Sequence, residues 1–188
     1  MNKKTWLGLA IASLLVSSLH AKASKEYTED GKLKFEYNYQ NGKKNGITTE
    51  YYKNGNIKVK WNYQDDILNG VSTKYGENGK KISDINFKND KQSGITSRYD
   101  QNGNLQYELN YENEMLNGIS KEYENGVLKA KWNYKDNIKN GQSTTFYPNG
   151  NPHYKLNYVN GTLNGVSIEY FKNGNKKAEW NYKDGVLD

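Results

Sequence analysis

An Asn-Gly or Asp-Gly dipeptide recurs along this chain at an almost constant spacing. Its glycines are Gly31, Gly55, Gly79, Gly103, Gly126, Gly150 and Gly174, so the period is 24 residues with one interval of 23. A second glycine follows each of the first six after 15 residues, at Gly46, Gly70, Gly94, Gly118, Gly141 and Gly165. A fixed period of this length is typical of a repeat protein, in which each unit packs against its neighbours in the sequence.

Within each repeat, two segments alternate between apolar and polar residues. Residues 57–63 place Ile, Val, Trp and Tyr at every second position, and residues 47–51 place Ile, Thr and Tyr in the same way. Such alternation indicates half-buried β-strands, so each unit is predicted to be a β-hairpin. The sequence therefore predicts an all-β fold. It is an elongated, single-layer antiparallel meander of about seven 24-residue β-hairpin repeats, with about fourteen short strands.

The turn at each Asn-Gly dipeptide is predicted from the parity of the two strands. Directly opposed residues share a face, so two strands with the same apolar positions need a loop with an odd number of residues. A three-residue loop that ends at Gly55, in the left-handed region, satisfies this condition. The expected pairs are Tyr51 with Ile57, Thr49 with Val59 and Ile47 with Trp61. This pairing predicts one apolar face and one face of Lys, Glu and Asn.

Two other turns complete the prediction. The turn around residues 41–46 is expected to be longer, in a register that stacks the units without stagger. In the short unit only four residues separate Tyr123 from Leu128, one fewer than in the regular units. Because Asn-Gly favours a type I′ turn, we expect Asn125 and Gly126 to form a two-residue loop, with Tyr123 still opposite Leu128.

Residues 1–23 have the pattern of a secretory signal peptide. Two lysines near the start precede an apolar run over residues 7–16, which is too short for a membrane-spanning helix. Ala21 and Ala23 are small residues at the two positions that a signal peptidase reads. We therefore expect cleavage after Ala23, export to a periplasm, cell surface or medium, and a repeat domain over residues 24–188.

The charge and the rare residue types exclude several function classes. Without residues 1–23 the net charge falls from +6 to +3, and no block of like charge points to a nucleic-acid partner. The chain has no Cys, which excludes a disulfide scaffold and a thiol nucleophile. His153 is the one His of the repeats and takes a position that is Lys in other units. We predict no catalytic residues, no metal and no cofactor, and hence no enzyme.

The repeat of a Tyr, then Asn-Gly, a few residues, a second Gly and a strand ending in Tyr resembles bacterial MORN-variant repeats of the YwqK type. The resemblance covers about residues 26–188, and the third unit departs from it at Lys81, Ser83 and Phe87. It implies a single-layer meander of hairpins that contacts proteins or membranes and has no enzymatic activity. Some YwqK-type proteins are labelled as antitoxins, a role that an export signal opposes.

Aromatic residues recur at fixed positions and are the candidate binding residues. We expect them to form one stripe along the sheet, and we assign the candidate partner-binding role to Trp61, Trp132, Trp180, Tyr39, Tyr63, Tyr111, Tyr134, Tyr158 and Tyr182. A second tyrosine row, which includes Tyr51 and Tyr123, is expected on the same face. A single layer has no second layer to cover this stripe, so part of it stays exposed or binds a partner.

The leading interpretation is an exported, non-enzymatic scaffold that binds another protein through this aromatic face. Repeat arrays offer extended binding surfaces, and aromatic side chains provide large contact areas. One alternative is a module that binds cell-wall carbohydrate, because hairpin repeats rich in Tyr and Trp resemble choline-binding wall repeats in outline. A membrane surface is a further possible partner, and an antitoxin of the YwqK type is a further alternative.

Overall fold

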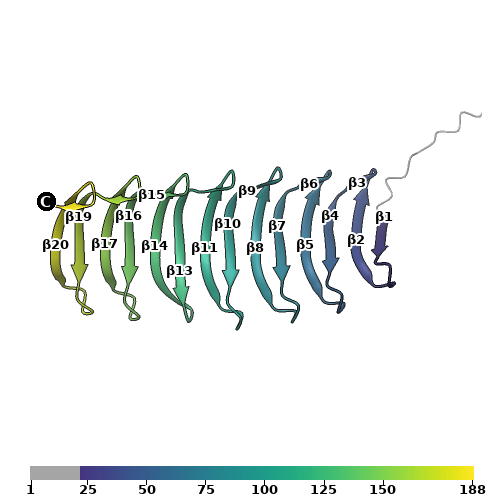
Figure 1. Ribbon diagram of the computed structural model, residues 1–188, viewed down its shortest axis with the longest axis horizontal. Helices are drawn as coiled ribbons and strands as arrows, with labels where there is room; N and C mark the ends of the chain where they lie inside the picture. Colours follow the sequence, from purple (N-terminus) through teal and green to yellow (C-terminus); the bar gives the residue numbers. More distant parts are fainter. Residues whose placement is uncertain (1–21) are drawn as a thin grey trace, which may run out of the picture.

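A computed structural model describes residues 22–188 and shows a single row of β-hairpins (Figure 1). The longer strands are β1 (Lys22–Tyr27), β2 (Leu33–Gln40), β4 (Gly46–Tyr51), β5 (Ile57–Gln64), β7 (Gly70–Tyr75), β8 (Lys81–Lys88), β10 (Gly94–Tyr99), β11 (Leu105–Glu112), β13 (Gly118–Glu124), β14 (Val127–Lys135), β16 (Gly141–Phe146), β17 (Pro152–Val159), β19 (Gly165–Tyr170) and β20 (Lys176–Lys183). The two-residue strands are β3 (Lys43–Lys44), β6 (Ile67–Leu68), β9 (Lys91–Gln92), β12 (Met115–Leu116), β15 (Ile138–Lys139), β18 (Thr162–Leu163) and β21 (Val186–Leu187).

The strands form one open antiparallel sheet, as the alternating sequence predicts. The sheet has 21 strands and not about fourteen, because a two-residue strand follows each tight turn. Each long strand pairs with the strands before and after it, as β4 does with β2 and β5, so the sheet is a continuous meander. Residues 22–188 contain no helix, and therefore none that could cross a membrane. The expected signal peptide lies outside the described residues, except that Lys22 and Ala23 begin β1.

The units stack without stagger, as expected. Phe35 pairs with Glu50, and Glu50 pairs with Val59, which holds in β5 the place that Phe35 holds in β2. Equivalent residues of successive units therefore form straight rows along the sheet. The seven long hairpins, β1–β2 to β19–β20, are numbered one to seven below.

The three-residue turn is confirmed, but the strand pairing beyond it is wrong. Gly55 has φ +88° and its amide donates to the Tyr52 carbonyl at 2.9 Å, and Tyr51 pairs with Ile57. A β-bulge follows, because Glu50 rather than Thr49 pairs with Val59. The extra residue in β5 shifts the register by one, and a shift of one exchanges the faces of a strand.

The same bulge occurs in all seven hairpins, so the predicted split into one apolar and one polar face is also wrong. In the second hairpin Trp61 pairs with Thr48, while Ile47 pairs with Asn62. We call the face that carries Trp61 and Thr48 the tryptophan face, and the face that carries Ile47 and Asn62 the asparagine face. Each face mixes apolar and polar rows.

The other turn is tighter than expected. It is a two-residue type I′ loop, with positive φ at both residues, as in Asn41 (53°) and Gly42 (76°). A two-residue strand follows and then a break at Asn45 before β4. These tight turns link successive units: the Asp90 amide donates to the Leu68 carbonyl at 3.0 Å, and the Asp90 Oδ1 accepts from the Leu68 amide at 2.7 Å.

The shortened fifth hairpin has the predicted loop. Asn125 and Gly126 have φ 50° and 79°, and Tyr123 pairs with Leu128. Ser120 pairs with Trp132 as Thr48 pairs with Trp61, so the missing residue does not reverse the faces. The deletion is absorbed entirely within the turn.

The core is thin and lies on the tryptophan face. Only two hydrophobic residues of the described chain are buried, Val59 and Ala130, with 6% and 1% of their surface exposed. Beside them runs a buried row of small polar residues: Thr48, Ser72, Thr96, Ser120, Ser143 and Ser167. These small side chains let the larger Trp, Leu and Ile side chains opposite them lie across the sheet.

The second glycine of each repeat opposes an aromatic residue of the tryptophan face, which is Phe87 for Gly70 and a tyrosine elsewhere, as Gly118 opposes Tyr134. Gly118 has φ +79°, and a Cβ built on it would lie 2.9 Å from the Asn110 Nδ2. Gly165 has a similar φ of +81° but open space around it. Glycine is therefore favoured at both positions by the positive φ, and at Gly118 also because a Cβ would come too close to Asn110.

Replacing Gly118 with Ala should destabilise the protein more than replacing Gly165 with Ala. The left-handed backbone alone costs about 1–2 kcal/mol for a residue with a Cβ, and only Gly118→Ala must also displace Asn110. Urea unfolding of both variants measures the difference. Equal losses of unfolding free energy would contradict the close approach of Asn110 to Gly118.

Candidate functional site

The three candidate tryptophans occupy one row of the tryptophan face. Trp61 pairs with Thr48, Trp132 with Ser120 and Trp180 with Ser167, which are equivalent positions of the second, fifth and seventh hairpins. All three are half-buried. The other hairpins hold Tyr37, Ile85, Leu109 and Leu156 in this row. The row is continuous, but its tryptophans are not adjacent.

The candidate tyrosines form a second row on the same face. They are Tyr39, Tyr63, Tyr111, Tyr134, Tyr158 and Tyr182, each opposite a glycine except Tyr39, which pairs with Lys22. All six are half-buried, and burial raises the pKa of Tyr63, Tyr134 and Tyr158. The structure therefore brings all the candidate residues to one face.

The second tyrosine row, expected on the same face, lies on the asparagine face because of the bulges. The Tyr123 hydroxyl donates to the Glu108 carboxylate at 2.9 Å, and the Lys121 Nζ donates to the same oxygen at 2.8 Å. Tyr99 makes the equivalent hydrogen bond to Asp84 at 3.0 Å. Burial and this hydrogen bond raise the pKa of Tyr99. These contacts join neighbouring hairpins, so this row has a structural role.

On the tryptophan face, Trp132 contacts both a cation and a carboxylate. The Lys139 Nζ lies 3.6 Å from the centre of the Trp132 ring and 5.3 Å from that of Tyr158. Burial lowers the pKa of Lys139, and Glu122 partly offsets this effect. The Trp132 Nε1 donates to the Glu122 Oε2 at 3.3 Å. A cation above an aromatic ring holds both groups in place.

Sequence reasoning missed Lys139, because the two-residue strand that carries it has no alternating pattern long enough to assign a face. Lys44 occupies the equivalent position nearer the N-terminus, 5.2 Å from the ring centre of Tyr37 and 5.1 Å from that of Tyr63. The equivalent position is Leu68, Gln92 or Leu116 in other units. A count from the first glycine of each repeat could have shown that these residues share one position with Lys139.

Three lysines of the tryptophan face are paired with carboxylates. The Lys58 Nζ lies 2.8 Å from the Glu50 Oε1, and the Lys129 Nζ lies 3.2 Å from the Glu122 Oε1. Near the C-terminus the Glu169 Oε1 accepts from the Lys177 Nζ at 2.8 Å. Other cations of this face, such as Lys44 and Lys139, lie over aromatic rings instead of beside a carboxylate. The positive charge of the tryptophan face is therefore only partly neutralised by ion pairs.

Apolar side chains also lie exposed on the asparagine face, where sequence reasoning expected none. They are Ile47, Val71, Ile95, Ile119 and Val166, with between 38% and 52% of their surface exposed. They share one position of the repeat and pair with the row of asparagines, as Ile119 pairs with Asn133. β-Branched side chains on a strand face are common and stabilise the extended backbone.

His153 packs against aromatic rings. Its ring centre lies 4.2 Å from that of Tyr147 and 4.0 Å from that of Tyr154, and its Nε2 lies 3.8 Å from the Glu169 Oε1. Within residues 22–188 no group of three or more His, Cys, Asp or Glu side chains could hold a metal ion. His153 therefore contributes to packing between the sixth and seventh hairpins.

Comparison with known families identifies the repeat. The family described as MORN repeat variant matches seven segments that together cover most of the chain: residues 23–41, 44–65, 68–89, 92–113, 116–136, 139–160 and 163–184. The chain belongs to this family. MORN repeats are generally non-enzymatic repeats that bind proteins or membrane lipids. No curated protein matches the sequence.

Proposed function

We propose that this chain is an exported, non-enzymatic scaffold that binds another protein through the tryptophan face. The observation that carries the proposal is the pair of half-buried Trp and Tyr rows on a sheet over which residues 22–188 place no second layer. A partner that covers these rows would remove their remaining apolar surface from water, and that burial would supply binding free energy.

A protein partner fits this face better than an anionic membrane does. Binding to anionic lipid needs several unpaired Lys or Arg side chains at the surface. The tryptophan face combines aromatic rings with Lys–Glu pairs such as Lys129 and Glu122. Its cations without a carboxylate, such as Lys44 and Lys139, lie in separate units and over aromatic rings, so they form no cluster. Protein interfaces combine aromatic anchors with a polar rim in this way.

Replacing Trp132 with Ala should weaken capture of the partner by about 30-fold or more, the size of effect seen at an interface anchor worth about 2 kcal/mol. Lys131→Ala is the matched control, because Lys131 is the neighbouring residue and lies on the asparagine face. Lys129, which the alternating pattern assigns to the polar face, contacts Glu122 and is not a suitable control.

The unchanged chain and each variant are immobilised, and the amount of the protein partner that each captures at moderate salt is compared. The melting temperature of each variant is recorded as well. Competition with wall glycan and with anionic vesicles tests the other partner classes. If a well-folded Trp132→Ala protein captures the partner normally while Lys131→Ala does not, the partner binds the asparagine face. Export is tested separately by the N-terminal residue of the protein recovered outside the cytoplasm, which we expect to be Ser24.

A further inference from the structure

The three-residue turns lie along one long edge of the sheet, opposite the tight turns (Figure 1). At two places on this edge a tyrosine spans the gap from its own turn to the next. The Tyr52 hydroxyl donates to the Tyr75 carbonyl at 2.9 Å, and the Tyr147 hydroxyl donates to the Tyr170 carbonyl at 2.9 Å. Both tyrosines occupy the same position of the repeat, 23 residues before the acceptor.

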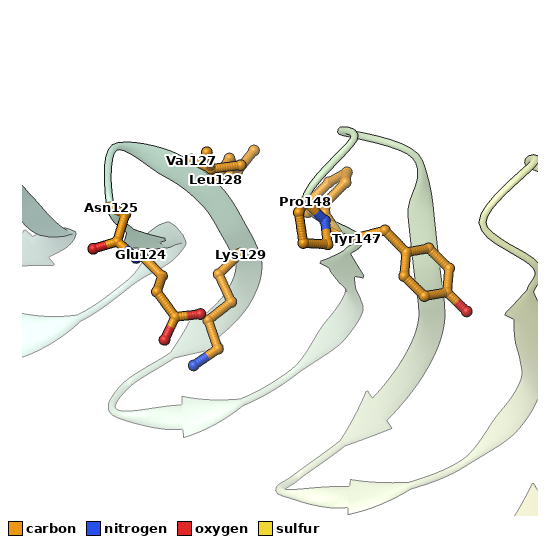
Figure 2. Close-up of a pocket in the computed structure, with 8 residues that line it drawn as sticks. Glu124, Asn125, Val127, Leu128, Lys129, Tyr147 and Pro148 are labelled. Carbon is orange, nitrogen blue, oxygen red and sulfur yellow. The ribbon is translucent and has the colours of Figure 1, made fainter.

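The shortened fifth turn leaves this gap open on its C-terminal side. A cavity of about 280 Å³ lies between the fifth and sixth turns, lined by Glu124, Asn125, Val127, Leu128, Lys129, Phe146, Tyr147 and Pro148. No side-chain hydrogen bond or ion pair of residues 22–188 joins these two turns. Figure 2 shows Tyr147 turned away from the cavity, toward the seventh hairpin.

This cavity is the unfilled equivalent of the space that Tyr52 spans. The fifth unit has Glu124 after Tyr123, where the second unit has Tyr52 after Tyr51, and it lacks one residue of the loop. Phe146 holds the repeat position of Tyr75 and Tyr170, so its carbonyl is the equivalent hydrogen-bond acceptor. The walls formed by Val127, Leu128 and Pro148 are apolar and suit a ring.

The cavity adjoins the tryptophan face. Lys129, which lines the cavity, pairs with the Glu122 Oε1, and the Glu122 Oε2 accepts from the Trp132 Nε1. A partner seated on Trp132 can therefore reach the cavity without leaving the surface that the proposed function already uses.

We propose that the cavity receives a tyrosine side chain of the protein partner, whose hydroxyl donates to the Phe146 carbonyl as Tyr52 does to Tyr75. The inference rests on the proposed function, since it names a chemical group of the same partner. The volume is close to the lower limit of about 300 Å³ for ligand pockets and suits a single ring. The carbonyl acceptor favours tyrosine over phenylalanine, because an unpaired acceptor would lose its contact with water.

The first test titrates the ¹⁵N-labelled protein with N-acetyl-tyrosinamide and, as the matched control, N-acetyl-phenylalaninamide. We expect shifts of the amide signals of Glu124 to Lys129 and of Phe146 and Tyr147, with the tyrosine probe binding about fivefold tighter. Equal affinity of the two probes, or shifts elsewhere on the sheet, would overturn the proposal. So would binding of 4-methylphenol without binding of the amide-capped tyrosine, because the cavity would then accept only free phenols.

The second test completes the short unit. Glu124→Tyr with a lysine inserted after it copies the Tyr52 and Lys53 sequence, so the new side chain should fill the cavity, abolish probe binding and raise the melting temperature. Val127→Trp, a larger side chain at another residue that lines the cavity, should also abolish binding and serves if the insertion variant does not fold. Undiminished probe binding by a folded variant would contradict the proposed location.

The two proposals can fail separately. Trp132→Ala should leave probe binding unchanged, because Trp132 does not line the cavity. If the completed unit loses the probe but captures the partner at full strength, the partner supplies no tyrosine and only the inference is wrong. If Trp132→Ala has no effect on capture while probe binding is as expected, the proposed use of the tryptophan face is wrong.

Discussion

Removal of residues 150–173 as one block should leave a shorter sheet that is folded and melts cooperatively. The deletion joins Asn149 to Gly174 and so restores an Asn-Gly turn, after which β16 can pair with β20 as it did with β17. Because each hairpin pairs only with its neighbours, the loss should lower the melting temperature without abolishing the fold. Circular dichroism and a thermal melt measure both.

Removal of half a unit should unfold the protein far more thoroughly. Deleting residues 150–161 removes β17 and joins β16 to β19 through a short link. These two strands run in the same direction, and parallel neighbours need a crossover of about a dozen residues or more. If the block deletion and the half-unit deletion lose the same amount of structure, the sheet is not a linear array in which each hairpin depends only on its neighbours.

Ser120→Leu should destabilise the protein by about 1–3 kcal/mol, the cost of forcing a larger side chain into a packed site. Ser120 has 1% of its surface exposed, faces Trp132, and its Oγ accepts from the Asn110 amide at 3.0 Å. Ile119→Ser is the matched control on the asparagine face. Ile119 has 52% of its surface exposed, so its loss should cost about 0.5 kcal/mol or less.

This pair of variants tests the assignment of the faces. The alternating sequence puts Ile119 on the covered face and Ser120 on the polar one, so it predicts the opposite order of the two effects. Urea unfolding of both variants decides between them. A larger loss for Ile119→Ser would mean that the bulge between Glu122 and Tyr123 is absent from the folded protein.

The sequence was sufficient for those parts of the fold that local chemistry determines. The Asn125 and Gly126 turn follows from the need for two residues with positive φ, and the stacking follows from the constant period. The bulge could not be found in this way, because its extra residue, Lys58, resembles any other strand residue. One unrecognised residue moved a whole strand to the other face, although every apolar position had been identified correctly.

The candidate site was likewise predictable from the sequence only in part. The rows of Trp132 and Tyr134 were predictable, because both residues follow the bulge of their strand. Simple alternation therefore places them on the same face. The cation over Trp132 depends on the tight turn that places Lys139 there. The cavity between the fifth and sixth turns depends on the residue that is missing from the fifth turn. Features built by neighbouring units in space are not visible in the pattern of a single unit.

The most direct test of the protein-binding role is an NMR titration of the labelled protein with its captured partner. We expect the indole signal of Trp132 and the amide signal of Lys139 to shift or broaden, because both lie on the tryptophan face. The amide signals of Ile95 and Ile119, exposed on the asparagine face, should remain unchanged. Shifts of Ile95 and Ile119 with no change at Trp132 would contradict the account.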